Sequence, residues 1–225
     1  MKNNNVLITG SSKGLGKELA HVFASNGHDI ILHGRDKENL KQIKQNILKK
    51  NKKIKCYVFE GDLRLQKSLG NLYEFAKAKQ TTILINNAGI GSQMNLENME
   101  DNEIEDILTT NLNVPIKLTK KFYKLFLELG KGTIININSI LGLEIGEYKS
   151  IYCASKWGLK GFTDAFRLEA QKNNVRIIGI YPTRVKTKPE YNYGMEPSTV
   201  ARKIYDLYAN TNLNELILDN RPKKR

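Results

Sequence analysis

Short apolar runs alternate with longer segments of helical periodicity along the whole chain. The short runs are rich in β-branched residues and predict strands at residues 6–9, 30–33, 54–59, 83–86, 133–138, 175–181 and 215–218. The longer segments repeat apolar positions every three or four residues and predict amphipathic helices at 15–25, 37–50, 68–78, 101–129 with a break near Pro115, 152–171 and 198–208. This alternation predicts an α/β fold, a doubly wound parallel sheet of about seven strands with helices on both faces.

No internal repeat, low-complexity tract or linker interrupts this pattern, so we expect a single domain over residues 1–225. The runs at 134–137 and 177–180 are almost wholly apolar, which is typical of central strands that are covered on both faces. Ligands bind such sheets at the carboxyl ends of the strands, near the switch in strand order. We therefore expect the functional residues in the loops that follow the strands.

The composition is that of a globular protein, with 40% hydrophobic and 26% charged residues. No apolar stretch is long enough to span a bilayer and the N-terminus lacks a signal-peptide core, so we expect a cytoplasmic protein with no membrane partner. The two cysteines, Cys56 and Cys153, have no CxxC or histidine neighbour, so we expect free thiols and no bound metal. The three histidines, His21, His28 and His33, show no triad or metal-ligand spacing and are interpreted as incidental.

The formal charge is +13, from 36 Lys and Arg against 23 Asp and Glu, which raises the question of a polyanionic partner. Much of the excess falls in residues 37–55 and in a basic tail at 220–225. Nucleic-acid-binding segments usually interleave aromatic residues or Gly-Arg pairs with their basic residues, and neither pattern occurs here. A nucleic-acid partner is therefore not expected, and steering of an anionic cofactor explains the charge more simply.

The first predicted strand runs into a glycine-rich loop that opens the first helix, Thr9-Gly10-Ser11-Ser12-Lys13-Gly14-Leu15-Gly16. Glycines let backbone N–H groups approach a pyrophosphate, and the helix N-terminus supplies partial positive charge. Because this loop lies inside the first strand–helix–strand unit, it predicts a dinucleotide site.

The end of the second strand indicates which dinucleotide is bound. NAD enzymes place a carboxylate there for the ribose 2′-hydroxyl, whereas an arginine pairs with a 2′-phosphate. Gly34 is expected at the tip, followed by Arg35, while Asp36 is the rival carboxylate but also has the pattern of a helix N-cap. Lys13 adds a second cation. NADP(H) is therefore favoured, with NAD(H) as the alternative.

Tyr152 and Lys156 lie four residues apart in a predicted helix and so share one face. An ammonium beside a phenol favours the phenolate and lowers its pKa from about 10. Tyr152 could then exchange a proton with a substrate oxygen at neutral pH. This spacing is common on exposed helices, so the surrounding motifs decide its meaning.

In order and spacing, these motifs resemble those of the short-chain dehydrogenase/reductase family, which has a Rossmann fold. The resemblance covers residues 6 to about 187 and includes an Asn-Asn-Ala-Gly signature after the fourth strand. It implies a set of cofactor-binding residues: Thr9, Gly10, Ser12, Lys13, Gly14, Leu15, Gly16, Arg35, Asp62, Leu63, Asn87, Ala88, Gly89, Tyr152, Lys156, Pro182, Val185 and Thr187.

The resemblance also implies a catalytic tetrad of Asn111, Ser139, Tyr152 and Lys156 for hydride transfer between a nicotinamide and a carbonyl or secondary alcohol. Tyr152 is the implied acid and base, and Lys156 lowers its pKa and binds the nicotinamide ribose. Ser139 binds the substrate oxygen, and Asn111 holds a water that relays protons. By the same resemblance we expect a homodimer or homotetramer that forms through the helices at 113–129 and 152–171.

Three features depart from the family pattern. Thr183 replaces the usual glycine after Pro182, and Asn138 stands where many members have a second serine. The substrate lid, at 188–196, is short, so the substrate pocket is expected to be small or exposed.

Two other functions stay open. One is reduction of a 3-oxoacyl group on a carrier protein, since surface lysines could engage an acidic carrier. The other is a redox sensor or interaction protein that binds the dinucleotide without turnover. A broken tetrad would favour that second function, whereas all four members are present.

Overall fold

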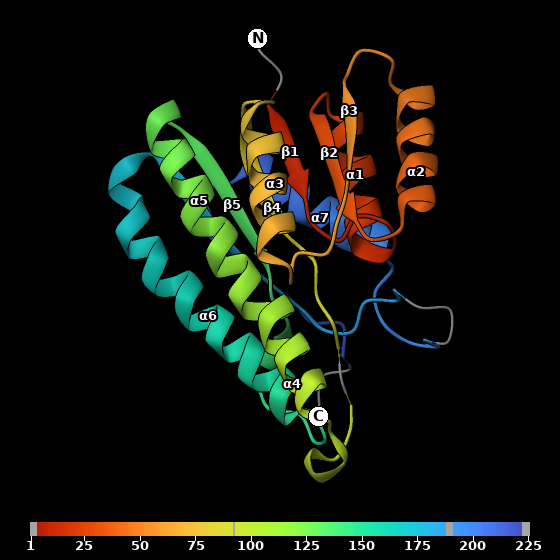
Figure 1. The fold of residues 1–225 in the computed structure, drawn as a ribbon, viewed down its shortest axis with the longest axis vertical. Helices are drawn as coiled ribbons and strands as arrows, with labels where there is room; N and C mark the ends of the chain where they lie inside the picture. Colours follow the sequence, from red (N-terminus) through yellow and green to blue (C-terminus); the bar gives the residue numbers. More distant parts are fainter. Residues whose placement is uncertain (1–3, 92, 188–190, 222–225) are drawn as a thin grey trace.

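The computed structural model describes residues 4–91, 93–187 and 191–221, and in it a seven-stranded parallel sheet lies between two layers of helices (Figure 1). The strand order is β3-β2-β1-β4-β5-β6-β7, so the direction of winding reverses between β1 and β4. The strands are β1 (Asn5–Ile8), β2 (Asp29–Gly34), β3 (Cys56–Glu60), β4 (Thr81–Asn86), β5 (Gly132–Ile137), β6 (Val175–Pro182) and β7 (Glu215–Leu218). The expected doubly wound fold is confirmed.

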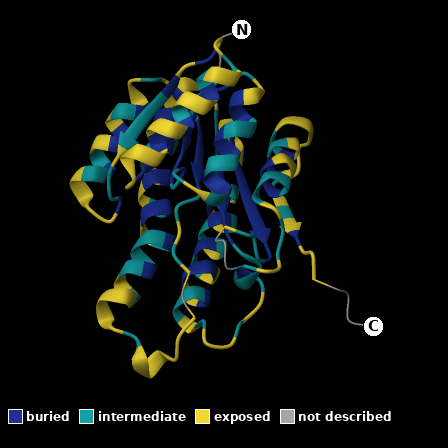
Figure 2. Ribbon diagram, turned by 90° about the vertical axis from the view of Figure 1, so that its right-hand side faces the viewer, coloured by how far each residue is buried: buried dark blue, intermediate teal, exposed yellow. Residues whose placement is uncertain are grey.

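Helices cover both faces of the sheet because successive strand residues point to opposite sides. In β1, Val6 and Ile8 face one apolar cluster and Leu7 faces the other. The first cluster is covered by α1 (Gly14–Ser25), α2 (Lys37–Lys50) and α7 (Pro197–Asn210). The second is covered by α3 (Gln66–Lys77), α5 (Val114–Leu129) and α6 (Ser150–Ala170). Figure 2 shows the buried strands between helices whose outer faces are exposed.

The predicted strands, and the predicted helices other than 101–129, end within two residues of the observed ones. The third strand begins at Cys56 rather than at Ile54. Its ladder with β2 starts with the pair of Ile30 and Cys56, and just before it the N–H of Lys55 donates to the side chain of Asp29 at 2.7 Å. The local sequence pattern therefore located the elements, and their bounds differ from the predicted ones by up to two residues.

The long helical segment differs from its prediction. It consists of α4 (Asp101–Leu108), a π-helical turn (Thr109–Asn113) and then α5, with Pro115 in the first turn of α5. Proline has no N–H to donate to the carbonyl four residues earlier, which here belongs to Asn111. The helix therefore changes its hydrogen-bond register instead of breaking, and Asn111 lies in the altered turn.

Both cysteines are buried and unpaired, and burial raises the pKa of the Cys56 thiol to about 12. In the described ranges, no three His, Cys, Asp or Glu side chains come together in a way that could hold a metal ion. None of the helices within those ranges has the length and apolar character needed to cross a membrane.

Candidate active site

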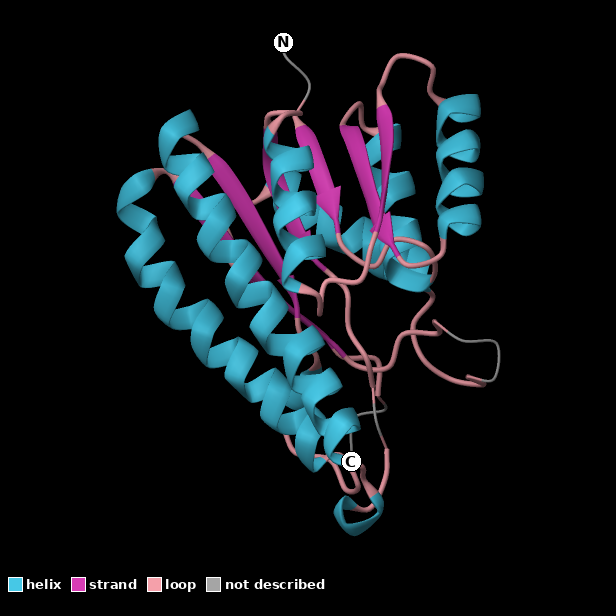
Figure 3. Ribbon diagram, in the orientation of Figure 1, coloured by secondary structure: helices cyan, strands magenta, loops and turns pink. Residues whose placement is uncertain are grey.

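The loops that follow the strands gather at the carboxyl edge of the sheet, which is the lower edge in Figure 3. The reversal of winding between β1 and β4 places the glycine loop beside the segment after β4. A crevice for a ligand is expected at such a reversal. Every segment that was predicted to bind the cofactor, in so far as it is described, begins or ends at this edge.

Two glycines of the loop have left-handed backbones, with φ of +66° at Gly10 and +55° at Gly14. A Cβ on Gly10 would lie 2.8 Å from the Cα of Ala88, and one on Gly16 would lie 2.3 Å from the carbonyl oxygen of Gly10. Helix α1 begins at Gly14, and no side chain caps its N-terminus. The first-turn N–H groups thus lack a side-chain acceptor and suit an anionic ligand, so the loop fits a dinucleotide pyrophosphate.

The segment after β6 lies directly over this loop. A Cβ on Gly14 would come within 3.0 Å of the side chain of Thr187. The loop is also close to the end of β2, because a Cβ on Gly34 would lie 3.2 Å from Ser12. The predicted residues Gly14, Ser12 and Thr187 therefore come together, whereas the side chains of Leu15 and Leu63 are buried and leave only their backbones for a ligand.

Hydrogen bonds join the glycine loop to the Asn-Asn-Ala-Gly segment. The hydroxyl of Thr9 accepts from the N–H groups of Asn87, at 2.9 Å, and Ala88, at 3.0 Å. The amide of Asn87 donates back to the carbonyls of Thr9, at 2.9 Å, and Gly10, at 3.1 Å. These side chains hold the two loops in one arrangement, so the hydrogen bonds of Thr9 and Asn87, both predicted to bind the cofactor, join the two loops to each other.

His33 also holds the glycine loop, and the interpretation of this histidine as incidental is wrong. The N–H of Gly10 donates to His33 Nδ1 at 3.3 Å, and His33 Nε2 lies 3.1 Å from the carbonyl oxygen of Gly61. Burial lowers the pKa of His33 to about 4. One signal was present in the sequence: His33 is the polar residue in an otherwise apolar run that ends at the predicted cofactor edge. His28, in contrast, packs among aromatic rings.

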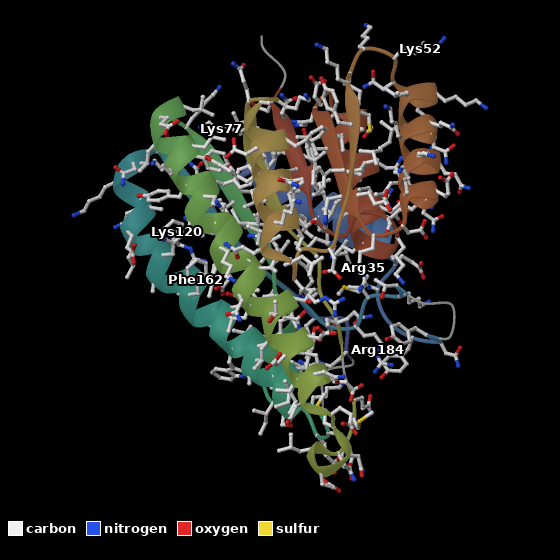
Figure 4. The ribbon with its side chains drawn as sticks, viewed as in Figure 1. Arg35, Lys52, Lys77, Lys120, Phe162 and Arg184 are labelled. Atoms are coloured by element: carbon white, nitrogen blue, oxygen red, sulfur yellow. The ribbon has the colours of Figure 1, made fainter. Side chains whose placement is uncertain are left out.

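At the end of β2, Arg35 is 68% exposed and its Nη1 lies 3.9 Å from the carboxylate of Asp62 (Figure 4). Asp36 is the N-cap of α2 and accepts from the N–H of Asn39 at 3.0 Å. The hydrogen bond from Arg64 lowers the pKa of Asp62 to about 2. The Asp36 carboxylate is thus engaged in capping, whereas the Arg35 guanidinium extends into solvent.

Ser139, Tyr152 and Lys156 come together at the end of β5. Ser139 caps a short 3-10 turn (Ile140–Gly142), and Tyr152 lies in the first turn of α6. Lys156 Nζ lies 5.7 Å from the centre of the Tyr152 ring and donates to the carbonyl oxygen of Ile137 at 3.1 Å. The tetrad residues at these positions are therefore close neighbours in space.

The expected lowering of the Tyr152 pKa by Lys156 is not what the structure shows. Burial raises the pKa of Tyr152 above its ordinary value, and the hydrogen bond with Ser139 opposes this only in part. Burial also lowers the pKa of Lys156 to about 8. The cause is that both groups are withdrawn from water, which disfavours the charged form of each.

The side chain of Asn111 is engaged with the backbone and does not extend into the site. Its Oδ1 accepts from the N–H of Ile90 at 2.8 Å, and its Nδ2 donates to the Ile90 carbonyl at 2.9 Å and to Ser155 Oγ at 3.1 Å. A Cβ on Gly89 would lie 3.3 Å from Asn111 Oδ1 and 4.0 Å from Lys156 Nζ. Asn111 thus lies near Lys156, and both the oxygen and the nitrogen of its side-chain amide are already hydrogen-bonded.

Thr183, which stands in place of the family's glycine, is buried and ties the end of β6 to the C-terminal segment. Its hydroxyl lies 2.8 Å from Asn220 Oδ1 and 3.2 Å from the carbonyl oxygen of Leu218. The other departure, Asn138, donates from its amide to the carbonyl of Lys156 at 3.1 Å. Both residues that depart from the family pattern therefore form hydrogen bonds that join neighbouring segments at the site.

The predicted lid begins at residues 188–190, which lie outside the described residues, and so does most of the basic tail. Within the described part of the lid, the rings of Tyr191 and Tyr193 lie 5.0 Å and 4.3 Å from the guanidinium of Arg184 (Figure 4). Of the tail, Asn220 and Arg221 are described, and Arg221 pairs with Glu144 at 2.7 Å.

Comparisons with known proteins agree with this geometry. The family model described as short chain dehydrogenase matches residues 4–195. The chain is 32% identical to the 3-oxoacyl-[acyl-carrier-protein] reductase FabG of Rickettsia felis, over 80% of this chain and 72% of that protein. It is 30% identical to dehydrogenase/reductase SDR family member 7B of Xenopus laevis, over 83% of this chain and 60% of that protein.

Solved structures show the same fold. A metagenomic short-chain oxidoreductase in complex with NADP has a TM-score of 0.86 and 25% identity, with 96% of each chain covered. The bulky-bulky ketone specific alcohol dehydrogenase of Comamonas testosteroni has a TM-score of 0.91 and 24% identity, over 99% of this chain and 89% of that one. With its glycine loop and its Ser-Tyr-Lys cluster at one edge of a doubly wound sheet, the chain belongs to the short-chain dehydrogenase/reductase family of oxidoreductases.

Proposed function

We propose that the protein uses NADP(H) to interconvert a carbonyl group and a secondary alcohol, with Tyr152 as general acid and base. One observation carries this proposal: Ser139, Tyr152 and Lys156 lie together at the edge that holds the glycine loop. A bound nicotinamide supplies the hydride, and the protein supplies orientation and the proton.

The protein's own residues account for the proton. In the reducing direction Tyr152 donates its phenolic proton to the oxygen on which negative charge develops, and in oxidation the phenolate accepts it. The raised pKa of Tyr152 keeps the phenol protonated, which suits it to act as an acid. We propose that the Ser139 hydroxyl, which hydrogen-bonds to Tyr152, binds the same substrate oxygen.

Lys156 is proposed to stabilise the phenolate that remains after proton transfer. Its Nζ is buried close to the Tyr152 ring, and a charge in such a dry site acts strongly on its neighbour. We propose that the same ammonium binds the nicotinamide ribose. The Asn111 carbonyl, which Pro115 cannot bond through the usual helical N–H, is the proposed holder of a proton-relay water.

The preference for NADP(H) over NAD(H) is proposed from the end of β2. Arg35 is exposed there beside Asp62, while the Asp36 carboxylate caps α2. An arginine at this place can pair with a 2′-phosphate, and Lys13, also exposed, adds a second cation. The metagenomic relative in complex with NADP supports this choice.

A specific observation favours one alternative substrate. The Rickettsia felis relative is named as a 3-oxoacyl-[acyl-carrier-protein] reductase, so a carrier-linked 3-oxoacyl group is the second candidate. Higher kcat/KM on a carrier-linked 3-oxoacyl group than on free ketones would favour it, whereas equal values would exclude a role for the carrier. A redox sensor without turnover is the third candidate and predicts NADPH binding with no activity on any substrate.

We further propose that the protein is a cytoplasmic homodimer or homotetramer that forms through α5 and α6, which lie side by side on one flank (Figure 1). The outer faces of these helices expose large apolar side chains: Leu127, Leu129, Trp157 and Leu168. Light scattering on the purified protein tests the assembly, with Leu168→Asp as the disrupting variant, and cell fractionation tests the location.

The decisive experiment for the activity is a panel of ketones and secondary alcohols, followed by the change in NADPH absorbance. We expect turnover of at least one class by the wild type, and a rate near background for Tyr152→Phe. Turnover that is equal in the two proteins would overturn the assignment of Tyr152.

A further inference from the structure

His33 bonds to both of the loops that border the proposed cofactor site. Its Nδ1 accepts the N–H of Gly10 at 3.3 Å, in the glycine loop. Its Nε2 lies 3.1 Å from the carbonyl oxygen of Gly61, the residue that directly precedes Asp62. The ring is buried and stacks on Phe59, with 6.3 Å between ring centres. The His33 side chain, which extends from β2, therefore links the loop after β1 to the loop after β3.

The two contacts assign the tautomer of the ring. A backbone N–H can only donate, so Nδ1 must carry a lone pair, and a carbonyl can only accept, so Nε2 must carry the proton. Burial lowers the pKa of His33 to about 4, and the hydrogen bond to the Gly61 backbone and the negative charge of Asp62 oppose this only in part. The imidazole is therefore neutral at physiological pH, and this is the one protonation state that satisfies both partners.

The backbone of His33 supports the same arrangement. Its N–H donates to Ser11 Oγ at 2.9 Å, and its carbonyl accepts from the N–H of Ser11 at 2.8 Å. The N–H of Gly61 donates to the carbonyl of Gly34 at 3.0 Å. These bonds hold the ends of the two loops against β2, and the imidazole adds a direct link between Gly10 and Gly61.

We propose that His33 is a positioning residue for the dinucleotide: its neutral imidazole fixes the spacing between the glycine loop and the loop that carries Asp62. This inference rests on the proposed binding of NADP(H). A dinucleotide contacts both loops at once, so it binds most tightly when their separation already matches its length. A ligand that contacts only the Asp62 side gains little from that separation.

Three substitutions separate this role from simple packing. His33→Phe keeps a ring against Phe59 but loses both nitrogen contacts. His33→Asn places its Oδ1 near the position of Nδ1 and keeps an acceptor for Gly10. His33→Gln places its amide nitrogen near the position of Nε2 and keeps a donor for Gly61. His28→Phe is the matched control, because His28 is also buried but lies among aromatic rings away from the loop.

The test measures the Kd of the full chain for NADPH and for 2′-AMP, which represents the adenosine end alone, together with kcat at saturating NADPH. For His33→Phe we expect the Kd for NADPH to rise about tenfold, the Kd for 2′-AMP to change less than about twofold, and kcat to change less than about threefold. His33→Asn and His33→Gln should each recover part of the NADPH affinity, and His28→Phe should bind both ligands as the wild type does.

Equal weakening of NADPH and 2′-AMP, or an unchanged Kd for NADPH, would overturn the inference. If the wild type binds neither NADPH nor NADH, the proposed function fails instead, and the two failures are thus distinguishable. A measurement on the wild type alone does not depend on the variants folding: nitrogen NMR of His33 should show the proton on Nε2 and none on Nδ1 near neutral pH. A proton on Nδ1 would contradict the proposed contacts.

Discussion

Asn111 holds the backbone of Ile90 at two points, accepting its N–H at 2.8 Å and donating to its carbonyl at 2.9 Å. Ile90 follows directly on the Asn-Asn-Ala-Gly segment, and Asn111 lies in the π-helical turn before α5. The contact therefore joins the segment after β4 to the helix pair that leads into α5. It places a buried amide beside the proposed site without exposing that amide to a substrate.

We expect Asn111→Leu to lower the free energy of unfolding by about 2–4 kcal/mol, because it leaves two backbone groups of Ile90 without partners. Urea unfolding measures the effect. Asn113→Leu is the control, since Asn113 is exposed in the same turn and its replacement should change stability by less than about 0.5 kcal/mol. Equal stability of the two variants would contradict the structural role of Asn111.

Tyr152→Phe should reduce kcat by at least about 100-fold, because the phenyl ring has no proton to transfer. Its Kd for NADPH should stay within about threefold of the wild type, since the ring itself is retained. Steady-state kinetics and fluorescence titration provide the two values. Tyr123→Phe, far from the site on α5, is the control and should leave both unchanged.

Lys156→Met should lose activity and gain stability. The folded-state pKa of Lys156 is lowered from 10.5 to about 8, so below pH 8 the folded protein holds a buried charge that the unfolded chain keeps in water. Removing that charge should raise the free energy of unfolding by about 1–2 kcal/mol at neutral pH, after the loss of the bond to Ile137 is counted. A less stable variant would show that the buried ammonium contributes favourably.

The lowered pKa of Lys156 also predicts how the stability of the wild type depends on pH. Between pH 8 and 10.5 the unfolded chain binds a proton that the folded protein has released, so stability from this group rises with pH in that window. Urea unfolding of wild type and Lys156→Met across the same window isolates the effect. The stability difference between them should shrink as the pH rises.

His33 predicts a second pH dependence of stability, on the acid side of neutrality. Its pKa is 6.5 in the unfolded reference and about 4 in the folded protein, so below pH 6.5 the unfolded chain gains a proton first. Relative to His33→Phe, the wild type should lose about 3 kcal/mol of stability between pH 6.5 and pH 4. Equal losses of stability in the wild type and in His33→Phe would show that carboxylates such as Asp62 account for the whole effect of acid.

Arg35→Ala should reduce the preference for NADPH over NADH by at least about tenfold in kcat/KM, mainly through weaker NADPH binding. Arg35 is exposed, so the substitution should leave the melting temperature nearly unchanged. Lys37→Ala removes a neighbouring charge that pairs with Glu60 and serves as the control. Unchanged discrimination in Arg35→Ala would remove the basis for the NADP(H) preference.

Much of the fold could be predicted because its signals are local. The alternation of apolar runs located the seven strands, and the glycines at positions 10 and 14 indicated a loop that needs left-handed backbones. The tetrad positions followed from the resemblance, and the structure brings Ser139, Tyr152 and Lys156 together. The roles of these side chains in catalysis stay predictions until the variants are measured.

The remaining features depended on contacts between distant parts of the chain. His33 was dismissed because its position in an apolar run does not show which groups it contacts, and its partner Gly10 lies 23 residues away. The direction of the Tyr152 pKa shift was predicted wrongly because spacing shows which groups are neighbours and not how far they are withdrawn from water.

By itself, then, the sequence determined the order and length of the elements, the place of the cofactor loop and the family. The elements and the loop follow from hydrophobic periodicity and from the conformational demands of single residues, which act over a few positions, whereas the family follows from the resemblance of the motifs. Only the tertiary structure decided that His33 joins two loops, that Asn111 clamps Ile90, and that burial governs the proton affinities of Tyr152 and Lys156. Hydrogen-bond partners and the exclusion of water from a side chain arise when remote segments pack together, and no local pattern encodes them.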